Sequence, residues 1–311
     1  MSKKTRIDLI YDIGNLENSG AMVHFNGLID SAAEANIDVR YIKTGQNYGV
    51  LRRAKYLISI SKRSPDGVIL RYSKVTLPWV VLLYFFSRRS KIFVEFNGAA
   101  GIENPKFTNK LIEKVTIKSL SRMKSVCGIS VSNGLRDYFF RRFNYKTTVI
   151  NNGSSAPIIQ NKIFRPSQSL KIIWFGTFQP WFDFSKLQDV KSCLSEKGIN
   201  SEFTIVGDGI QKDLVTKVAR DLNATVYPWM KQNDLYNLLK DQDICIDIDK
   251  RKKLNNELYD PLKKRDCNNL NVHYATSDEI INSLEQILSE DVSKLSRSWS
   301  DVWNEYTNLI D

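Results

Sequence analysis

Residues 170–222 read LKIIWFGTFQPWFDFSKLQDVKSCLSEKGINSEFTIVGDGIQKDLVTKVARDL, and this stretch decides the fold. Two short runs rich in β-branched and aromatic residues, 170–175 and 202–206, alternate with two longer amphipathic runs, 186–196 and 212–222. Such alternation is typical of βαβ units, which build a parallel sheet covered by helices. The stretch therefore predicts an α/β fold.

The same alternation extends over nearly the whole chain. In the first half we predict strands at 6–12, 38–42, 67–71, 91–96, 125–131 and 147–150, with helices at 21–35, 50–61, 77–87, 109–123 and 135–143. In the second half we predict further strands at 224–227 and 244–248, with helices at 233–240, 278–288 and 292–309. Between 249 and 271 the pattern breaks into a basic, Asn-rich segment.

The length of 311 residues favours two domains, because domains cluster at roughly 100–150 residues. The polar stretch from Asn151 to Ser169 has the Asn, Ser and Pro content of an interdomain linker. We therefore predict one Rossmann-like domain at 1–155 and a second at 156–290. A C-terminal helix within 291–311 is expected to pack back across the domains.

Composition excludes several classes of protein. A hydrophobic content of 42% and a charged content of 25% are average for folded globular proteins. The longest apolar run, Val75 to Phe86, falls short of the ~20 residues of a membrane-spanning helix, and no cleavage site follows the basic start. The four cysteines form no CxxC pair, so neither a zinc site nor a disulfide framework is indicated. We expect a cytoplasmic protein.

Charge is distributed unevenly between the two halves. Residues 1–155 hold 25 Lys and Arg against 11 Asp and Glu, a net charge of +14, and the remainder holds 20 against 23, a net charge of −3. The first half is therefore expected to meet an anionic partner, and nucleic acid, a lipid surface and a phosphorylated substrate all qualify.

Three glycine-bearing turns follow predicted strands. They are Gly14 to Gly20, Trp174 to Thr177, and Val206 to Gly209. In parallel sheets ligands bind beyond the carboxyl ends of the strands, and glycine lets backbone N–H groups approach an anion. Each turn alone is a weak signal, and neither a dinucleotide-binding GxGxxG nor a P-loop motif is present.

The order of the motifs resembles glycosyltransferase family 4 along nearly the whole chain. In the first half the similar segments are the Gly-Ser loop at Ser19-Gly20, Arg71-Tyr72-Ser73, Val94-Glu95-Phe96-Asn97-Gly98, Val131-Ser132-Asn133-Gly134-Leu135 and Val149-Ile150-Asn151-Asn152-Gly153. In the second half they are Phe175-Gly176-Thr177-Phe178-Gln179-Pro180-Trp181, Phe203-Thr204-Ile205-Val206-Gly207-Asp208-Gly209 and Tyr259-Asp260-Pro261-Leu262-Lys263. The last of these resembles the family's SPLK motif.

This resemblance implies the GT-B fold, in which two Rossmann-like domains face each other across a cleft. It implies retaining transfer of a sugar from a nucleotide-diphosphate donor, bound by the C-terminal domain, to a glycan or polyprenyl-diphosphate-linked acceptor, bound by the N-terminal domain. No metal or other cofactor is required in that family. The implied roles are catalytic for Glu95 and Asp266, donor-binding for Gly20, Gly176, Gly207, Gly209 and Lys263, and acceptor-binding for Ser19, His24, Asn97 and Arg71.

Several positions depart from the family pattern. Gln179 stands where one branch has Arg, and Leu258 stands where the first glutamate of the E-x7-E motif is expected. The loop and strand that normally follow the SPLK helix are not recognisable between Cys267 and Val272, so we expect a truncated C-terminal domain whose sheet lacks a strand. The alternative function is therefore a catalytically inactive GT-B-like subunit that binds and stabilises a partner glycosyltransferase.

Other candidate residues have competing interpretations. Asp247-Ile248-Asp249 spells the metal-binding D-x-D of GT-A enzymes, but the two-domain pattern disagrees with that fold, so we expect no metal site. His24 is interpreted either as an acceptor contact or as a buried structural histidine. Glu95 needs a partner or a wet cleft, because burying a lone carboxylate is costly.

The basic first half is best explained by a membrane surface. Basic residues interleaved with stacking aromatics are absent, which argues against nucleic acid. A cationic acceptor domain would instead lie on an anionic inner leaflet. The residues expected to form that face are Arg52, Arg53, Lys55, Lys62, Arg63, Arg88, Arg89 and Lys91.

Overall fold

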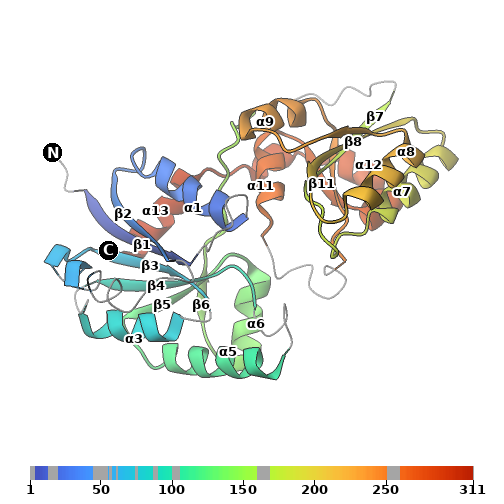
Figure 1. Ribbon diagram of the computed structural model, residues 1–311. Coiled ribbons are helices and arrows are strands. Elements are labelled where there is room, and N and C mark those ends of the chain that lie inside the picture. Colours follow the sequence, from blue (N-terminus) through green and yellow to red (C-terminus); the bar gives the residue numbers. More distant parts are fainter. Residues whose placement is uncertain are drawn as a thin grey trace. The chain divides into compact units, whose positions relative to one another are not determined.

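The computed structural model describes residues 4–12, 20–44, 55, 58–60, 62–73, 76–86, 90–99, 106–159, 169–250 and 260–310. The chain divides into two compact units (Figure 1). The first comprises Met1–Gly153, Asn256–Leu262 and Ser298–Asp311, and the second comprises Ser154–Asn255 and Lys263–Arg297. The C-terminal helix therefore belongs to the first unit.

The first unit is built on a parallel sheet with the strand order β2-β1-β3-β4-β5-β6. Its strands are β1 (Thr5–Asp12), β2 (Ile37–Thr44), β3 (Gly67–Arg71), β4 (Lys91–Phe96), β5 (Val126–Ser130) and β6 (Thr147–Val149). Its helices are α1 (Gly20–Ser31), α3 (Thr76–Phe86), α5 (Phe107–Leu120), α6 (Asn133–Phe143) and α13 (Trp299–Ile310).

Alternate residues of these strands pack into two separate hydrophobic cores. Val68, Leu70 and Val94 pack with α3, α5 and α6 on one face of the sheet. Ile69 and Phe93 pack with α1 and α13 on the other face. Since successive strand side chains point to opposite faces, a strand buried on both faces needs a continuous apolar run, as 67–71 provides.

The second unit has a five-stranded parallel sheet in the order β11-β10-β7-β8-β9. Its strands are β7 (Leu170–Thr177), β8 (Ser201–Asp208), β9 (Thr225–Tyr227), β10 (Ile244–Asp247) and β11 (His273–Thr276). Its helical elements are α7 (Ser185–Glu196), α8 (Lys212–Leu222), α9 (Gln232–Lys240), α11 (Leu262–Asn269, whose first residue belongs to the first unit), α12 (Ser277–Ser289) and the 3-10 helix η1 (Val292–Leu295).

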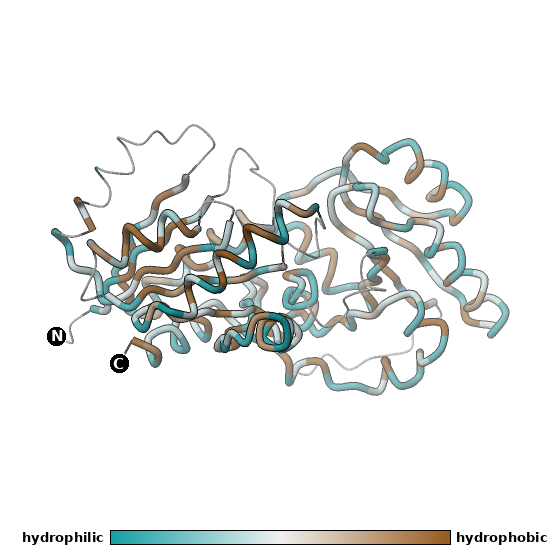
Figure 2. The backbone as a smooth tube through the Cα atoms, turned by 90° about the horizontal axis from the view of Figure 1, so that it is seen from below, coloured by the Kyte–Doolittle hydropathy of each residue, from teal (hydrophilic) through white to brown (hydrophobic). Residues whose placement is uncertain are grey.

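Apolar side chains fill the inside of each unit. In Figure 2 the hydrophobic residues, in brown, follow the strands through the interior, and hydrophilic residues, in teal, gather on the outer turns. In the second unit, α7, α8 and α12 cover one face of the sheet and α9 and α11 cover the other.

Most of the predicted elements are confirmed. The strands at 67–71 and 91–96 and the helix at 212–222 agree with the structure to the residue. The helix predicted at 50–61 lies largely outside the described residues, although 55 and 58–60 are helical.

The prediction of one continuous helix over 292–309 is wrong. The 3-10 helix η1 ends before Ser298, and α13 begins with Trp299. Ser298 and Asp301 cap α13 reciprocally: the Ser298 N–H donates to the Asp301 carboxylate at 2.8 Å, and the Asp301 N–H donates to Ser298 Oγ at 3.2 Å. Such a capping pair starts a new helix rather than continuing an old one.

Two elements that the sequence did not predict follow residue 260, and the expectation of a truncated C-terminal domain whose sheet lacks a strand stays a prediction. Residues 262–269 form α11, and His273–Thr276 forms β11, which pairs in parallel with β10. Asn271 joins the two elements with a left-handed φ of 55°, a conformation that asparagine tolerates better than most residues. The end of the Asn-rich segment thus forms a helix and a turn, which lead into a strand.

No helix in the described part of the chain is long and apolar enough to cross a membrane.

Candidate functional site

A buried polar cluster lies at the carboxyl end of the first sheet. Arg71, at the end of β3, and Glu95, near the end of β4, are register partners on adjacent parallel strands. With Tyr11, His24, Asn97 and Tyr306 they make up the Glu95 cluster. Parallel strands bring their carboxyl ends to one edge, which explains how residues so distant in sequence meet.

The Glu95 carboxylate is enclosed by hydrogen-bond donors. Tyr11 Oη lies 3.1 Å from Oε1, Tyr306 Oη lies 2.9 Å from Oε2, and Asn97 Nδ2 donates to Oε1. His24 Nε2 lies 3.5 Å from Oε2. Because Glu95 is only 2% exposed, it is held as a fixed buried charge and does not open to solvent.

Electrostatics keep this charge in place. Burial works to raise the pKa of Glu95, but His24, Arg71 and the hydrogen bonds from Asn97 and Tyr306 outweigh it, and the pKa is lowered. Burial also lowers the pKa of His24 to about 4, and Glu95 only partly compensates. At neutral pH His24 is therefore neutral, and Glu95 is held ionised by Arg71 and by the hydrogen bonds from Asn97 and Tyr306.

The partly exposed members of the cluster are Asn97 and Arg71. Arg71 Cζ lies 5.7 Å from the centre of the Tyr11 ring. His24 is 2% exposed and stacks on Trp299, with the ring centres 4.8 Å apart. Its environment is that of a buried histidine, and Ser19, the remaining residue expected to bind an acceptor, lies outside the described residues.

The second unit carries the glycine turns at the carboxyl ends of β7 and β8. Gly176 and Gly207 are register partners, and their φ values of 145° and 146° are rarely adopted by other residues. A Cβ on Gly207 would lie 1.9 Å from the Gly176 carbonyl oxygen, so the strand ends can approach this closely only because Gly207 has no side chain. Gly209, with φ 153°, continues this turn.

Lys263 lies directly against this glycine edge. Its ammonium lies 4.5, 5.1 and 5.2 Å from the ring centres of Trp174, Phe175 and Phe182, and a Cβ on Gly176 would lie 2.6 Å from Nζ. We call these five residues the Lys263 cluster. Aromatic faces attract a cation without neutralising it.

No carboxylate among the described residues forms an ion pair or hydrogen bond with the Lys263 ammonium. Burial lowers its pKa, and Cys245, Asp247, Cys267 and Asp249 act in the opposite direction. A desolvated cation beside glycine backbone is suited to receiving an anionic ligand, because binding would restore its missing counter-charge.

Asp266 lies one turn further along α11 and is 9% exposed. Ser154 Oγ donates to Oδ1 at 2.6 Å, and Tyr236 Oη lies 3.4 Å from the same atom. Burial raises the pKa of Asp266 to about 6, although both hydrogen bonds work to lower it. Asp266 is thus a buried carboxylate with hydroxyl partners.

The remaining predicted residues are not members of these clusters. Gly20 begins α1 and belongs to the first unit, whereas the other glycines assigned to the donor belong to the second. Asp247 accepts hydrogen bonds from Tyr274 Oη and from the Asp249 N–H, an arrangement that uses its oxygens within the protein. No group of three or more metal-binding side chains occurs among the described residues.

The sequence did not predict several residues that contribute to the Glu95 and Lys263 clusters. Tyr306 and Trp299 reach the Glu95 cluster from the end of the chain, and no local pattern links residue 306 to residue 95. The sequence shows Trp174 and Phe182 only as aromatic residues near Gly176, without indicating that they contact Lys263. Their role as walls around a lysine depends on α11, which the sequence did not predict.

The two parallel sheets and the order of their elements define an α/β protein of the GT-B fold. No protein-family model matches the chain. No curated protein matches it either.

Solved structures share this fold at low sequence identity. HepE of Anabaena, in complex with UDP, is 13% identical with a TM-score of 0.64, covering 98% of this chain and 99% of that one. The apo form of the lipopolysaccharide outer core galactosyltransferase WaaB is 12% identical with a TM-score of 0.61, at the same coverage of both chains.

A third similar structure is longer than this protein. A point mutant of TarM from S. aureus, solved in complex with fondaparinux, alpha-GlcNAc-glycerol and UDP, is 14% identical with a TM-score of 0.57. The match covers 84% of this chain but only 59% of TarM. At such identities these likenesses establish the fold.

Proposed function

We propose that this protein is a glycosyltransferase that moves a sugar from a nucleotide-diphosphate donor to a glycan or polyprenyl-linked acceptor, with retention at the anomeric carbon. The observation that carries the proposal is the Lys263 cluster, an ammonium held by aromatic rings against a glycine strand edge, with no carboxylate partner among the described residues. Supporting it, HepE and TarM, which share the fold, were solved with UDP.

In this proposal the second unit binds the donor. Breaking the glycosidic bond builds negative charge on the diphosphate leaving group, which Lys263 and backbone N–H groups at Gly176, Gly207 and Gly209 would stabilise. Asp266, ionised above pH 6, would accept hydrogen bonds from the ribose hydroxyls or the sugar. No metal or other cofactor enters the mechanism.

The first unit would bind the acceptor through Asn97 and Arg71. Glu95 would act mainly by holding Asn97 in one orientation and by balancing the charge of Arg71. This assigns Glu95 a positioning role, which fits its burial better than direct contact with substrate.

The test is release of nucleoside diphosphate from a panel of UDP- and GDP-sugars, because such enzymes also transfer slowly to water. We expect one donor to react, with Asp266→Asn lowering kcat/KM at least tenfold. The result against the proposal is a folded protein with no release from any donor, even with extracted bacterial lipids as acceptors.

One observation favours the alternative, an inactive GT-B-like subunit that stabilises a partner glycosyltransferase. Glu95 and Asp266, the two carboxylates for which the family resemblance implies catalytic roles, are 2% and 9% exposed and already hydrogen-bonded within the protein. A well-folded chain that binds no nucleotide would support this alternative.

A further inference from the structure

Helix α3 is unusual for a helix at a protein surface. Its sequence, TLPWVVLLYFF, has no charged residue, and only one side is buried, by Trp79, Val80 and Leu83. The outward side is also apolar, with Phe85 61% and Leu82 37% exposed. A helix that is hydrophobic all round normally has cover on every side, so its outer face is unpartnered within the described part of the first unit.

Helix α5, beside α3 on the same face of the sheet, shows a related pattern. Phe107, Leu111 and Val115, each four residues apart, form an exposed apolar stripe, and Phe107 is 79% exposed. Lys110, Lys114 and Lys118 stand exposed beside the stripe. Long lysine side chains can lie along an apolar surface while the ammonium reaches outward.

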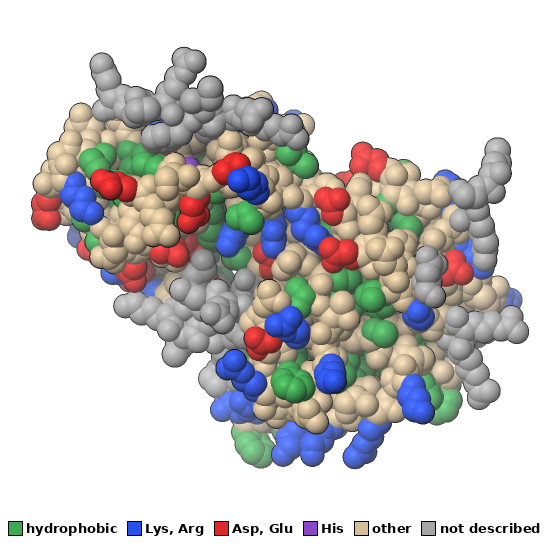
Figure 3. Space-filling view, turned by 180° about the vertical axis from the view of Figure 1, so that it is seen from behind, with side chains coloured by type: hydrophobic (Ala, Val, Ile, Leu, Met, Phe, Trp, Pro, Cys, Tyr) green, Lys and Arg blue, Asp and Glu red, His purple; other side chains and the backbone are tan. Residues whose placement is uncertain are grey.

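The surface formed by these two helices is defined by Leu82 and Phe85 of α3 and by Phe107, Lys110, Leu111, Lys114, Val115 and Lys118 of α5; we call it the α3–α5 face. In Figure 1 the two helices run along the lower edge of the first unit, and α3 contacts α5. Figure 3, from behind, shows Lys and Arg side chains beside hydrophobic ones along that lower edge.

Charge identifies the kind of partner that fits this surface. Among the described residues between 76 and 130 the only carboxylates are Glu95 and Glu113, which are 2% and 0% exposed. Every exposed charge on these described residues is therefore positive. An apolar surface with cations standing among its hydrophobic residues is complementary to an anionic lipid interface, where acyl chains and headgroups lie side by side.

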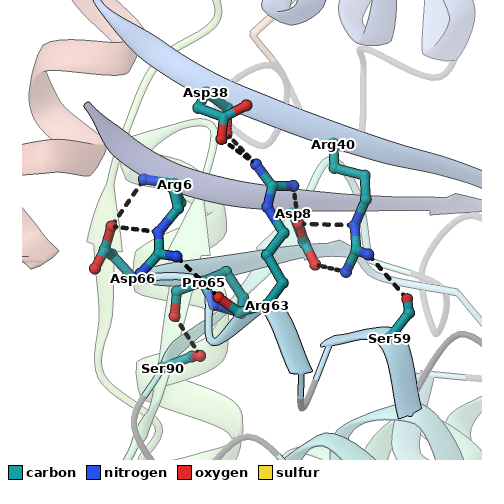
Figure 4. A network of polar contacts seen from close by, with 9 residues as sticks. All are labelled: Arg6, Asp8, Asp38, Arg40, Ser59, Arg63, Pro65, Asp66 and Ser90. Atoms are coloured by element: carbon teal, nitrogen blue, oxygen red, sulfur yellow. Dashed lines mark hydrogen bonds and ion pairs between the residues drawn. The ribbon is translucent and has the colours of Figure 1, made fainter. Parts of the chain in front are cut away.

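This face differs from the basic face expected from the sequence. Arg63 is engaged within the protein, since it contacts the carboxylates of Asp8 at 2.9 Å and Asp38 at 2.6 Å (Figure 4). Asp8, which is fully buried, also pairs with Arg40 at 2.5 Å. Arg52, Arg53, Arg88 and Arg89 lie outside the described residues. Arg63 is therefore engaged in ion pairs within the protein, whereas the three lysines of α5 are exposed.

We propose that the α3–α5 face docks this protein peripherally on an anionic lipid surface, with Phe85 and the α5 stripe inserted among the headgroups and the three α5 lysines against lipid phosphates. The inference stands independently of the proposed transfer reaction. A lipid-linked acceptor would make such docking useful, but lipid binding needs neither donor nor catalysis.

The first arm of the test is flotation with vesicles of phosphatidylcholine, either alone or with roughly 30 mol% of phosphatidylglycerol. We expect binding only to the anionic vesicles, weakening as NaCl is raised. The triple variant Lys110→Glu, Lys114→Glu, Lys118→Glu should partition about 100-fold less, because each basic residue near such a surface contributes roughly a factor of five. A charge-matched control, Lys217→Glu, Arg220→Glu, Lys231→Glu on the second unit, should bind as the parent does.

The second arm tests the apolar contribution. The triple variant Phe85→Ser, Phe107→Ser, Leu111→Ser should lose at least tenfold in partitioning, and its melting temperature should not fall, because these side chains are exposed. The matched control is Ile210→Ser, Leu214→Ser, Val226→Ser, which removes exposed apolar residues from the second unit. Nucleotide binding, measured in parallel, should be equal in all of these proteins.

Three results would overturn the proposal. One is absence of binding to anionic vesicles by a folded parent protein. Another is an equal loss of binding in the control variants, which would mean that net charge alone drives association. The third is a parent dimer in solution that the Phe85, Phe107, Leu111 variant converts to a monomer without any change in lipid binding, which would make the face a protein interface.

Discussion

Single buried charges decide how the two candidate sites work. Glu95 is surrounded by hydrogen-bond donors, whereas Lys263 is surrounded by aromatic rings and lacks a carboxylate partner among the described residues. The first arrangement satisfies a charge and fixes its neighbours, and the second leaves a charge available. Both residues were predicted from the sequence, but their different states were not, because they depend on Tyr306 and Trp174.

Asp266 should make stability depend on pH. Its native pKa of about 6 is above the unfolded value near 3.8, so the native state binds the extra proton between these values. The resulting contribution to the free energy of unfolding is fully present below about pH 4. It is lost as pH rises towards 6, which lowers the free energy of unfolding by up to about 3 kcal/mol. Urea unfolding from pH 4 to pH 7 should therefore show the parent losing stability relative to Asp266→Asn. A pH-independent difference between the two proteins would show that Asp266 titrates normally.

At the scale of elements, apolar sequence patterns predicted helices and strands reliably, and polar patterns did not. The strands at 67–71 and 91–96 are bounded runs of β-branched and aromatic residues, and the sequence predicted them to the residue. Helix α11 was missed because its sequence LKKRDCNN lacks an apolar periodicity, although Asp266 to Asn269 are all buried. Burial there depends on hydrogen bonds, such as the one from Asn269 Nδ2 to the Ala156 carbonyl at 3.0 Å, which no hydropathy pattern reveals.

The turn from α11 to β11 depends on a left-handed residue. Asn271→Gly should be more stable than Asn271→Val, because glycine adopts a φ of 55° freely. Asn271→Val should lose roughly 1–2 kcal/mol, since a β-branched side chain is strained there. Chemical denaturation of the three proteins would check this. Equal stability of the valine variant would contradict the conformation assigned to this turn.

At the scale of the whole molecule, the last helix completes the first unit. Trp303 of α13 is fully buried, and its indole N–H donates to the Leu28 carbonyl at 2.9 Å. Gly27 admits the Trp299 ring, since a Cβ there would lie 2.1 Å from its nitrogen. The sequence predicted a C-terminal helix, but its partner surface is set by contacts between opposite ends of the chain, which leave no local signal.

Loss of this packing should destabilise one unit. Trp303→Ala should cost about 3–5 kcal/mol, the range for deleting a large buried aromatic side chain. Hydrogen exchange should become faster at the amides of β1, β3 and β4 and stay unchanged at those of β7 and β8. Faster exchange in both sheets to the same extent would contradict the division of the chain into these two units.

The most direct test of the central claim is calorimetric titration of the parent, Lys263→Met and Lys264→Met with UDP and GDP. Methionine keeps an unbranched side chain among the rings but removes the charge, and Lys264 is the neighbouring lysine on the same helix. We expect saturable binding of one nucleotide, weakened about 30-fold in Lys263→Met, since a charge-assisted contact contributes about 2 kcal/mol. Lys264→Met should stay within about twofold of the parent. A folded parent that binds neither nucleotide, or equal losses in both variants, would contradict the assignment of the Lys263 cluster as a diphosphate site.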